Sequence, residues 1–203
     1  MFTGLVETAV PVLGFEPHGA GARLTLPRPP AEDLACAWDP APGDSVAVSG
    51  CCLTVVEVTS AGETRYDLSA ETLARTWFAS QRDRPVNLER PLRLFDRLGG
   101  HLVTGHVDGL GRIRATTDSK DGGRLFTFEV EPGFERWLID KGSVCVDGIS
   151  LTVVAPRERS FDVAVIPETL RRTSLGTARR GAAVHLEADA IGKWVEKLAG
   201  PWT

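Results

Sequence analysis

Over most of the chain, apolar and polar residues alternate in short runs that are rich in Val, Leu, Phe and Thr. Gly, Pro, Asp and Ser separate the runs, which is the pattern of short β-strands joined by tight turns. The runs read SVAVSG, CLTVVEV, RYDLSA and VNLE in the first half, and LFTFEV, SVCVDG, LTVV, FDVAVI and VHLEAD in the second. About six strands per half would leave exposed edges in a flat sheet, so we predict a small closed barrel in each half.

The two halves repeat one another in sequence. Four blocks recur in the same order: TGLVE at Thr3–Glu7 as TGHVD at Thr104–Asp108, GDSVAVSGCCLTVV at Gly43–Val56 as KGSVCVDGISLTVV at Lys141–Val154, AETLART at Ala70–Thr76 as PETLRRT at Pro167–Thr173, and VNLE at Val86–Glu89 as VHLE at Val184–Glu187. Collinear blocks at nearly constant spacing indicate a duplicated unit. We therefore predict two homologous modules, residues 1–97 and 98–189, followed by a helix and tail at 190–203.

Turn and helix signals fall at equivalent places in the modules. The pairs Ser49-Gly50 and Asp147-Gly148 predict tight turns, because glycine tolerates positive φ. One helical patch is predicted in each module, PPAEDLACAW in the first and PGFERWLIDKG in the second.

The tail reads DAIGKWVEKLAG and predicts an amphipathic helix. Ile191, Trp194, Val195 and Leu198 form one apolar stripe, Asp189 can cap the start, and Gly200-Pro201 ends the helix. The helix could pack on its own barrel or on other copies of the chain. The little chain that remains after it favours the oligomer.

Composition narrows the classes of partner. The net charge of −4 argues against a nucleic-acid partner that needs a basic face. No apolar run approaches the ~18–20 residues that span a bilayer, and the first residues do not resemble a secretory signal.

Metal binding is not predicted. The cysteines are Cys36, Cys51, Cys52 and Cys145, and their spacing fits no zinc pattern. His101 and His106 lie in the glycine-rich segment GGHLVTGHVDG, where H-x4-H lacks a third ligand. We predict free thiols in a reducing, cytoplasmic setting.

The residues that the two modules share, and those at which they differ, indicate binding sites with different reactive side chains. Thr54 and Thr152 recur as equivalent polar positions, which favours two sites for similar ligands. Cys52 is replaced by Ser150 in the second copy, while Ser49 becomes Asp147 and Leu5 becomes His106. If two identical molecules react with one another, one must be activated as an acid or base or by a nucleophile, and the other must not. Two similar sites with different side chains would provide that difference.

The whole chain from Met1 to about Trp194 resembles the riboflavin synthase alpha-chain family. The resemblance rests on MFTGLVE, GCCLTV, GGHLVTGHVDG, KGSVCVDGISLTV, IPETLRRTSLG and VHLEAD. It implies two six-stranded Greek-key barrels and a C-terminal helix that builds a homotrimer. It further implies a cofactor-free dismutation of two molecules of 6,7-dimethyl-8-ribityllumazine to riboflavin and 5-amino-6-ribitylaminouracil, in sites between the N-terminal barrel of one subunit and the C-terminal barrel of another.

Residues are carried over position by position from the same resemblance. The first substrate site is expected to comprise Gly4, Leu5, Val6, Cys52, Leu53, Thr54, Asp67, Leu68, Ser69, Ala70, Glu71 and Thr72, with Phe2 reaching the reacting pair. The second is expected to comprise Gly105, His106, Val107, Lys141, Ser150, Leu151, Thr152, Ala164, Val165, Ile166, Pro167, Glu168 and Thr169.

The expected chemical residues are Ser45, Cys52, His101, Asp147 and Ser150. His101 is the candidate base for the acidic C7 methyl group of one lumazine. Cys52 or Ser45 could supply or position the nucleophile, and Asp147 could hold a proton relay. Two positions stay open: Asp189 matches a polar family position or caps the tail helix, and Lys141 contacts a ribityl chain or caps the preceding helix.

Other functions remain to be distinguished. Relatives with the same double barrel bind a lumazine or flavin as a fluorescent antenna without catalysis, and some family members associate with lumazine synthase. The polar letters in both barrels favour the enzyme. A flavin-dependent reductase lacks support, because no dinucleotide fingerprint follows a strand. The chain also has Ser49 where the family more often has Asn, and we expect a small effect on turn stability.

Overall fold

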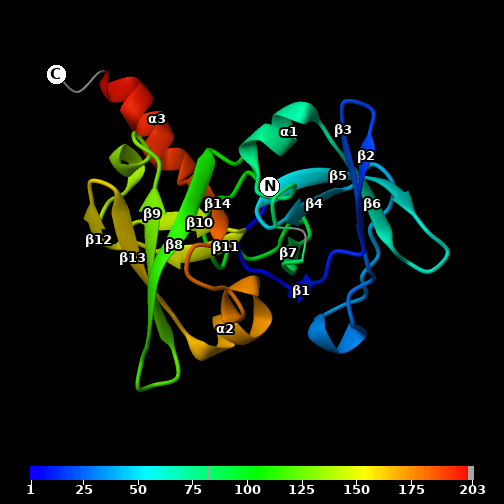
Figure 1. Cartoon of the computed structure of the whole chain (residues 1–203), viewed down its shortest axis with the longest axis horizontal. Helices are drawn as coiled ribbons and strands as arrows, with labels where there is room; N and C mark the ends of the chain where they lie inside the picture. Colours follow the sequence, from blue (N-terminus) through cyan, green and yellow to red (C-terminus); the bar gives the residue numbers. More distant parts are fainter. Residues whose placement is uncertain (82, 201–203) are drawn as a thin grey trace.

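A computed structural model describes residues 1–81 and 83–200. The first half contains β1 (Thr8–Val10), β2 (Gly14–His18), β3 (Gly21–Leu26), η1 (Ala31–Asp33), β4 (Ser45–Val48), β5 (Cys51–Val58), β6 (Thr64–Leu68), α1 (Ala70–Arg75) and β7 (Val86–Glu89). The second contains β8 (Gly109–Asp118), β9 (Arg124–Val130), η2 (Glu135–Trp137), β10 (Ser143–Val146), β11 (Ile149–Thr152), β12 (Val154–Arg157), β13 (Ser160–Val165), α2 (Pro167–Arg172), η3 (Ser174–Gly176) and β14 (Ala183–Ala188), before α3 (Ala190–Ala199). Figure 1 shows the halves side by side.

Each half forms one antiparallel sheet, in the order β1-β7-β4-β5-β6-β3-β2 and in the order β11-β10-β14-β8-β9-β13-β12. The outermost strands of each order are consecutive in the chain, so each sheet closes on itself and the predicted tandem barrels are confirmed. The count of six strands is corrected to seven, because one strand is broken in each barrel. The long β8 of the second barrel corresponds to β1 and β2 of the first, and the long β5 of the first corresponds to β11 and β12.

The predicted turns are present and equivalent. Ser49 and Gly50 have φ of 44° and 78°, and Asp147 and Gly148 have φ of 47° and 81°. Two consecutive positive φ values define the turn whose twist matches a β-hairpin. The Ser49 hydroxyl also accepts a hydrogen bond from the backbone N–H of Asn87. Serine therefore holds this turn without the amide of an asparagine.

The helices inside the modules differ from the prediction. The two predicted patches are single 3-10 turns, η1 and η2, whereas the helices α1 and α2 lie in the AETLART and PETLRRT repeats. Phe134 and Leu138 do recur at helical spacing, but both side chains are buried in the second barrel's core. Their spacing reflects burial against that core, which a short turn achieves as well as a helix.

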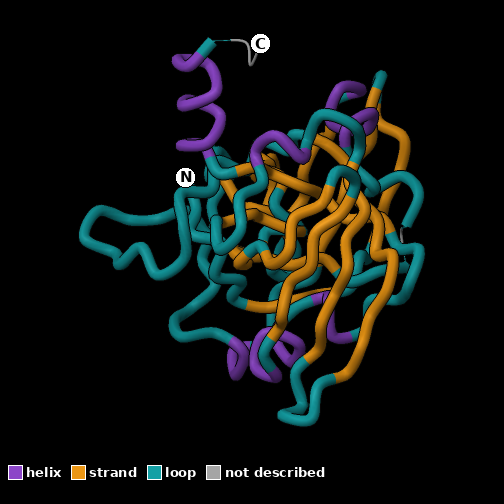
Figure 2. Tube along the Cα trace, turned by 90° about the vertical axis from the view of Figure 1, so that its left-hand side faces the viewer, coloured by secondary structure: helices purple, strands orange, loops and turns teal. Residues whose placement is uncertain are grey.

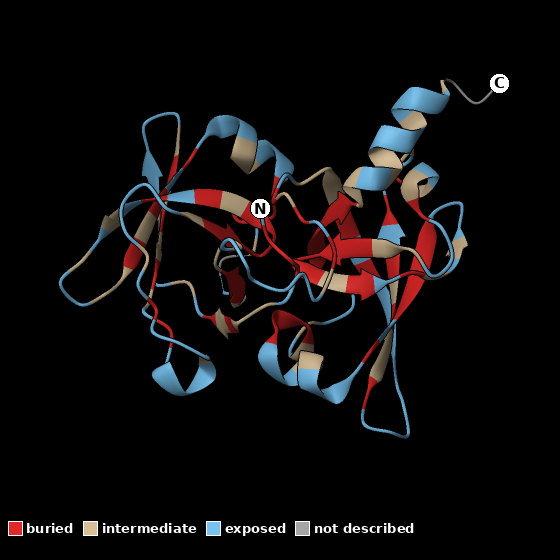
Figure 3. Cartoon of the chain, turned by 180° about the vertical axis from the view of Figure 1, so that it is seen from behind, coloured by how far each residue is buried: buried red, intermediate tan, exposed pale blue. Residues whose placement is uncertain are grey.

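Each barrel has its own core, and a third small cluster lies between them. Aromatic residues fill the second core, where Phe126, Phe128 and Phe161 are fully buried and their rings contact one another. The small cluster consists of Phe2, Ala47, Val103 and Cys145, with Cys52 packed against it. In Figure 3 buried residues line both barrels and continue through the region between them. The barrels are therefore joined by packed side chains as well as by the chain.

Helix α3 is confirmed, with the Asp189 carboxylate accepting a hydrogen bond from the N–H of Ile191 at 2.9 Å. Its polar side is attached to the second barrel, because Lys193 pairs with Asp108 and Glu196 accepts from the indole of Trp137. Its apolar stripe faces outward, and Trp194 and Leu198 are 68% and 82% exposed. Figure 2 shows the helix projecting from one end of the molecule. The predicted residues Pro201–Thr203 lie outside the described part of the chain.

Candidate active site

The segment that begins each module crosses to the other barrel. The N–H of Ser150 in β11 donates to the carbonyl of Gly4 at 2.8 Å, and the N–H of Cys52 in β5 donates to the carbonyl of Gly105 at 2.8 Å. Phe2 and Val103 form an antiparallel bridge where the segments pass each other. Figure 1 places the N-terminus between the barrels, as this exchange requires.

The exchange corrects the predicted division of the two sites. Gly4–Val6 lie with Ser150 rather than with Cys52, and Gly105–Val107 lie with Cys52 rather than with Ser150. Val6 packs against the core of the second barrel, and Val107 against that of the first. Because TGLVE and TGHVD are nearly identical, neither segment carries a local signal that distinguishes its own barrel from the other.

The crossing requires glycine at two positions. A Cβ at Gly4 would lie 2.6 Å from Ser150 Cβ, and a Cβ at Gly105 would lie 2.5 Å from Cys52 Cβ. Both glycines also have positive φ, 75° and 82°. Backbone therefore packs directly on the strand that carries the candidate chemical residue.

The remaining predicted residues gather at equivalent ends of the two barrels, where two neighbouring strands separate, and we call each such end an opening. In the first, the β5–β6 ladder begins at the Val55–Tyr66 pair, so the start of β5 and the end of β6 lie unpaired with each other at the same end. In the second, β11 and the end of β13 are related in the same way. The chain then enters α1 or α2. Cys52–Thr54 and Asp67–Thr72 thus share one opening, and Ser150–Thr152 and Ala164–Thr169 share the other.

The first opening presents a thiol and two hydroxyls on one face. Ser45 pairs with Thr54 across β4 and β5, and Cys52 lies two residues before Thr54 on the outward face. Thr54 is exposed and Cys52 is half-buried, whereas Leu53 points into the core. Ser69 caps α1 by accepting from the N–H of Thr72 at 3.1 Å. His106, next to Gly105, is on this side of the molecule and is exposed.

The second opening holds a histidine and a serine in direct contact. His101 Nδ1 and Ser150 Oγ are 2.7 Å apart. His101 is 7% exposed, and its Nε2 has no hydrogen-bond partner among the described residues. Burial lowers the pKa of His101, and the carboxylate of Asp189 partly opposes this. The lowered pKa favours the neutral imidazole, and in the tautomer in which Nδ1 donates to Ser150, Nε2 is the nitrogen that can accept a proton.

Asp147 lies elsewhere, in a buried polar network between the barrels. Its carboxylate accepts hydrogen bonds from the indole N–H of Trp77, the backbone N–H of His185 and the guanidinium of Arg84. The side chain is fully buried. The structure does not bring Asp147 together with His101 and Ser150. These donors match its charge, which indicates a structural role, and its predicted proton relay stays a prediction.

The ring of Phe2 is fully buried in the cluster between the barrels, against which Cys52 packs, and its predicted contact with the reacting pair stays a prediction. Asp189 caps α3 and also acts on His101 through its charge. Lys141 lies in the turn before β10, with φ of 63° and an exposed side chain.

His185 in the buried network makes stability depend on pH. It stacks on Trp77, and burial lowers its pKa to about 4. Because the unfolded chain binds the proton more readily, stability is retained above pH ~6.5 and falls as the pH drops toward 4, by roughly 3 kcal/mol for this group. Urea unfolding of wild type and His185→Gln between pH 7 and 4 measures the effect, which the variant should lack. His18→Gln, which removes an exposed imidazole, should keep the wild-type slope; an unchanged slope in His185→Gln would contradict the assignment.

Two carboxylates absent from the predicted sites lie beside them. Glu89 at the end of β7 receives hydrogen bonds from Thr3 and Gly4, and Glu187 in β14 receives them from Thr104 and Gly105. The recurrence of VNLE as VHLE was the available sequence signal. Among residues 1–81 and 83–200, no cluster of three or more His, Cys, Asp or Glu side chains could hold a metal ion. Over the same residues, no helix is long and apolar enough to cross a membrane.

Comparison with known proteins identifies the family. The family model described as the lumazine binding domain matches residues 3–91 and again 104–189. The riboflavin synthase of Mycobacterium tuberculosis is 43% identical over 202 residues, covering 98% of both chains. That of Actinobacillus pleuropneumoniae is 38% identical over 199 residues, covering 98% of this chain and 89% of its own.

A solved structure shares the fold. LumP in complex with riboflavin superposes with a TM-score of 0.81 at 21% identity, over 93% of this chain and 99% of LumP. LumP was also solved with 6,7-dimethyl-8-(1'-D-ribityl)lumazine. The resemblance read from the sequence is confirmed: the chain belongs to the riboflavin synthase family and carries two lumazine-binding domains in tandem.

Proposed function

We propose that the protein is a riboflavin synthase, a transferase that converts two molecules of 6,7-dimethyl-8-ribityllumazine into riboflavin and 5-amino-6-ribitylaminouracil by moving a four-carbon unit between them. The observation that carries the proposal is the pair of equivalent openings with unlike chemistry. One holds the thiol of Cys52, and the other holds His101 in contact with Ser150 at 2.7 Å. Two like ligands bound there would meet different groups, as a dismutation requires.

His101 is the proposed base for the C7 methyl group of the lumazine in the second opening. Its neutral imidazole accepts a proton through one nitrogen while Ser150 orients the ring through the other. Cys52 or Ser45, at the first opening, is proposed to supply or position the nucleophile for the other lumazine. Holding two rings in a fixed mutual pose can contribute up to ~7–11 kcal/mol to catalysis.

The remaining lining residues are proposed to bind substrate. With the exchanged segments, the first site comprises Cys52–Thr54, Asp67–Thr72 and Gly105–Val107, and the second comprises Gly4–Val6, Lys141, Ser150–Thr152 and Ala164–Thr169. The module boundaries at 97 and 189 stay a prediction. The supporting observation is that β7 ends at Glu89 and β8 begins at Gly109, while β14 ends at Ala188 and α3 begins at Ala190, so both boundaries fall outside the strands.

The function is tested by mixing the purified protein with 6,7-dimethyl-8-ribityllumazine alone and following riboflavin absorbance. One riboflavin should appear for each two lumazines consumed. A tight fluorescent complex without turnover would instead identify an antenna-type binding protein, the alternative that shares this fold.

We further propose a homotrimer whose active sites form between the first barrel of one subunit and the second barrel of its neighbour. The support is the apolar stripe of α3, which is exposed on the single chain. A cytoplasmic location is supported by the unpaired state of the four cysteines, all within the described residues. Association with lumazine synthase is proposed from family resemblance alone.

The trimer can be tested at α3. The double substitution Trp194→Asp and Leu198→Asp places charge in the stripe and should convert the trimer to monomer in sedimentation velocity. Turnover should be lost with it, because each site needs two subunits. Lys197→Gln changes an exposed polar position of the same helix and should leave both unchanged. A trimer that survives the double substitution would exclude α3 as its main contact.

A further inference from the structure

Glu89 and Glu187 bind the crossing segments in the same way. One oxygen of Glu89 accepts from the N–H and the hydroxyl of Thr3 at 2.6 and 2.7 Å, and the other accepts from the N–H of Gly4 at 3.0 Å. Glu187 accepts from the N–H and hydroxyl of Thr104, both at 2.7 Å, and from the N–H of Gly105 at 2.9 Å. Each carboxylate thus accepts three hydrogen bonds from one Thr-Gly pair.

Both carboxylates are buried, unlike most glutamate side chains. Glu89 and Glu187 are 5% and 3% exposed, and among the described residues neither side chain forms an ion pair. Burial raises the pKa of Glu89, while the donors from Thr3 and Gly4 lower it. Burying a carboxylate is unfavourable unless hydrogen bonds compensate the lost hydration. The three donors therefore stabilise each buried carboxylate, and each carboxylate fixes the position of the Thr-Gly backbone.

The threonine hydroxyl extends the hold to the next residue. Thr3 Oγ1 accepts from the N–H of Leu5 at 3.0 Å, and Thr104 Oγ1 accepts from the N–H of His106 at 3.3 Å. Each carboxylate therefore fixes the backbone of the first two of the three residues that were predicted to line an opening, one directly and one through the threonine hydroxyl.

The effect of each carboxylate falls on the other barrel. Glu89 belongs to the first barrel, but Gly4 contacts Ser150 and the carbonyl of Thr3 accepts from the N–H of His101 at 3.1 Å. Glu187 belongs to the second barrel, but Gly105 contacts Cys52. Each carboxylate thus belongs to one barrel and positions a segment that packs against the candidate chemical residues of the other barrel.

We propose that Glu89 and Glu187 are crossed positioning residues, Glu89 for the Ser150–His101 opening and Glu187 for the Cys52 opening. This inference rests on the proposed function for its catalytic consequence. Its structural part is independent of that function and can be measured without substrate.

The test is thiol alkylation in a Cys36→Ser background, which removes the exposed thiol. Cys52 reports on the first opening, and Ser150→Cys introduces a thiol at the second. Cys51 and Cys145 are buried and report on global unfolding. Glutamine keeps the shape of Glu but directs an NH2 group at backbone N–H donors, so Glu89→Gln and Glu187→Gln should each free one segment.

The expected pattern is crossed. Glu187→Gln should raise the alkylation rate of Cys52 roughly tenfold, equivalent to ~1.4 kcal/mol in segment opening, and leave the thiol of Ser150→Cys unchanged. Glu89→Gln should do the reverse. Glu16→Gln and Glu129→Gln, at exposed strand positions of the first and second barrel, should change neither rate. A rise on the same barrel as the substitution, or an equal rise at both positions, would overturn the proposal.

If a glutamine variant labels Cys51 and Cys145 as well, it has unfolded globally. Thr3→Val and Thr104→Val then decide, since they remove only the hydroxyl. Thr3→Val should act at position 150 and Thr104→Val at Cys52, and the absence of that pattern would reject the crossing.

Turnover provides the second readout, in the chain that retains Ser150. Glu89→Gln should lower kcat and move the acid limb of its pH profile, because Thr3 also holds His101. Glu187→Gln should lower kcat without moving that limb. If the parent protein makes no riboflavin, the proposed function fails, whereas the alkylation pattern still tests the positioning role.

Discussion

Replacing His101 with glutamine should lower riboflavin synthesis by roughly 10²–10⁴-fold, the usual contribution of a positioned general base. Glutamine can keep a hydrogen bond to Ser150, whose Oγ lies 2.7 Å from His101 Nδ1, but it cannot take up a proton. The side chain is buried beside backbone of the crossing segment, so its loss should alter chemistry more than substrate affinity. Steady-state kinetics should therefore show a fall in kcat with little change in KM.

The role of His101 as a base also predicts how activity changes with pH. Because burial lowers the pKa of His101, the imidazole stays unprotonated to a lower pH than an exposed histidine does. Activity should accordingly persist below the ordinary histidine pKa of ~6.5 and fall only as protonation overtakes the base. His101→Gln should remove that acid limb. His18→Gln, at an exposed site on β2, should keep both turnover and profile. Full turnover in His101→Gln would remove this residue as the base.

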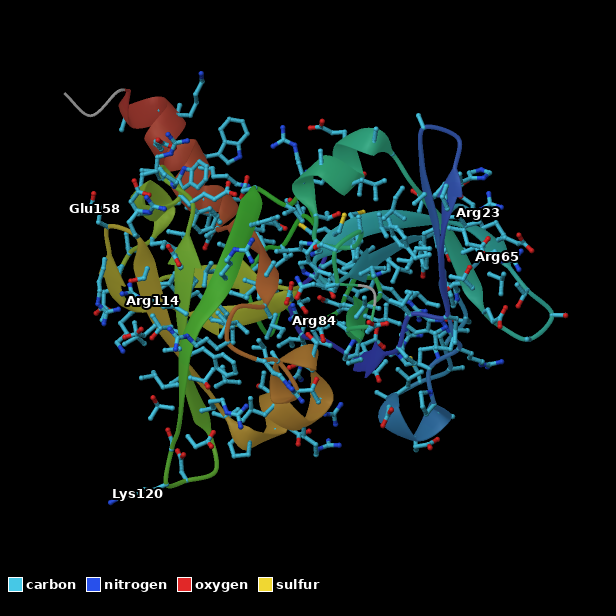
Figure 4. The ribbon with its side chains drawn as sticks, in the orientation of Figure 1. Arg23, Arg65, Arg84, Arg114, Lys120 and Glu158 are labelled. Atoms are coloured by element: carbon cyan, nitrogen blue, oxygen red, sulfur yellow. The ribbon has the colours of Figure 1, made fainter. Side chains whose placement is uncertain are left out.

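Arg84→Leu should lower the free energy of unfolding by about 3–5 kcal/mol, the cost of leaving a buried charge without its partner. Arg84 donates to the carboxylate of Asp147, which is fully buried, and also to the carbonyl of Ala183. Its guanidinium lies over the ring of Trp77 at 4.9 Å from the centroid. Figure 4 shows Arg84 in the region between the barrels, so the loss should loosen their junction.

Arg65→Leu is the matched control. Arg65 pairs with Glu57 at 2.9 Å, but both side chains are about one third to one half exposed, at 34% and 47%. Figure 4 places Arg65 at the outer side of the first barrel. An exposed pair contributes at most about 1 kcal/mol, so urea unfolding should separate the two variants clearly. Equal stabilities would show that the Arg84–Asp147 pair does not hold the junction.

Asp147→Asn follows from the same network. The amide keeps the size of the side chain but loses the charge that faces Arg84, so stability should fall before catalysis is affected directly. A folded but less stable Asp147→Asn protein with unimpaired turnover would agree with a structural role in the buried network. Unchanged stability with lost turnover would instead support the catalytic role that the sequence predicted for Asp147.

Local pattern was sufficient for the repeated barrels, the turns and the final helix. Strand periodicity, a pair such as Ser49-Gly50 and a stripe such as Ile191 to Leu198 each describe what the backbone does over a few residues. The chemical roles of His101, Cys52 and Ser150 rest on family resemblance rather than on local pattern, and they stay predictions. Local pattern gave a wrong prediction in PGFERWLIDKG. Its apolar residues recur at helical spacing because they are buried in the barrel core, and the segment forms only a 3-10 turn.

Only the tertiary structure decided which parts meet. Thr3–Gly4 and Thr104–Gly105 carry the same letters, so the sequence could not reveal that each packs on the opposite barrel. The burial of Phe2 and Asp147 and the outward face of α3 are likewise properties of the assembled surfaces. The physical reason is that strand, turn and helix signals come from short-range geometry. The partner of a segment is chosen by which of two similar surfaces, about one hundred residues apart, buries it with its hydrogen bonds satisfied.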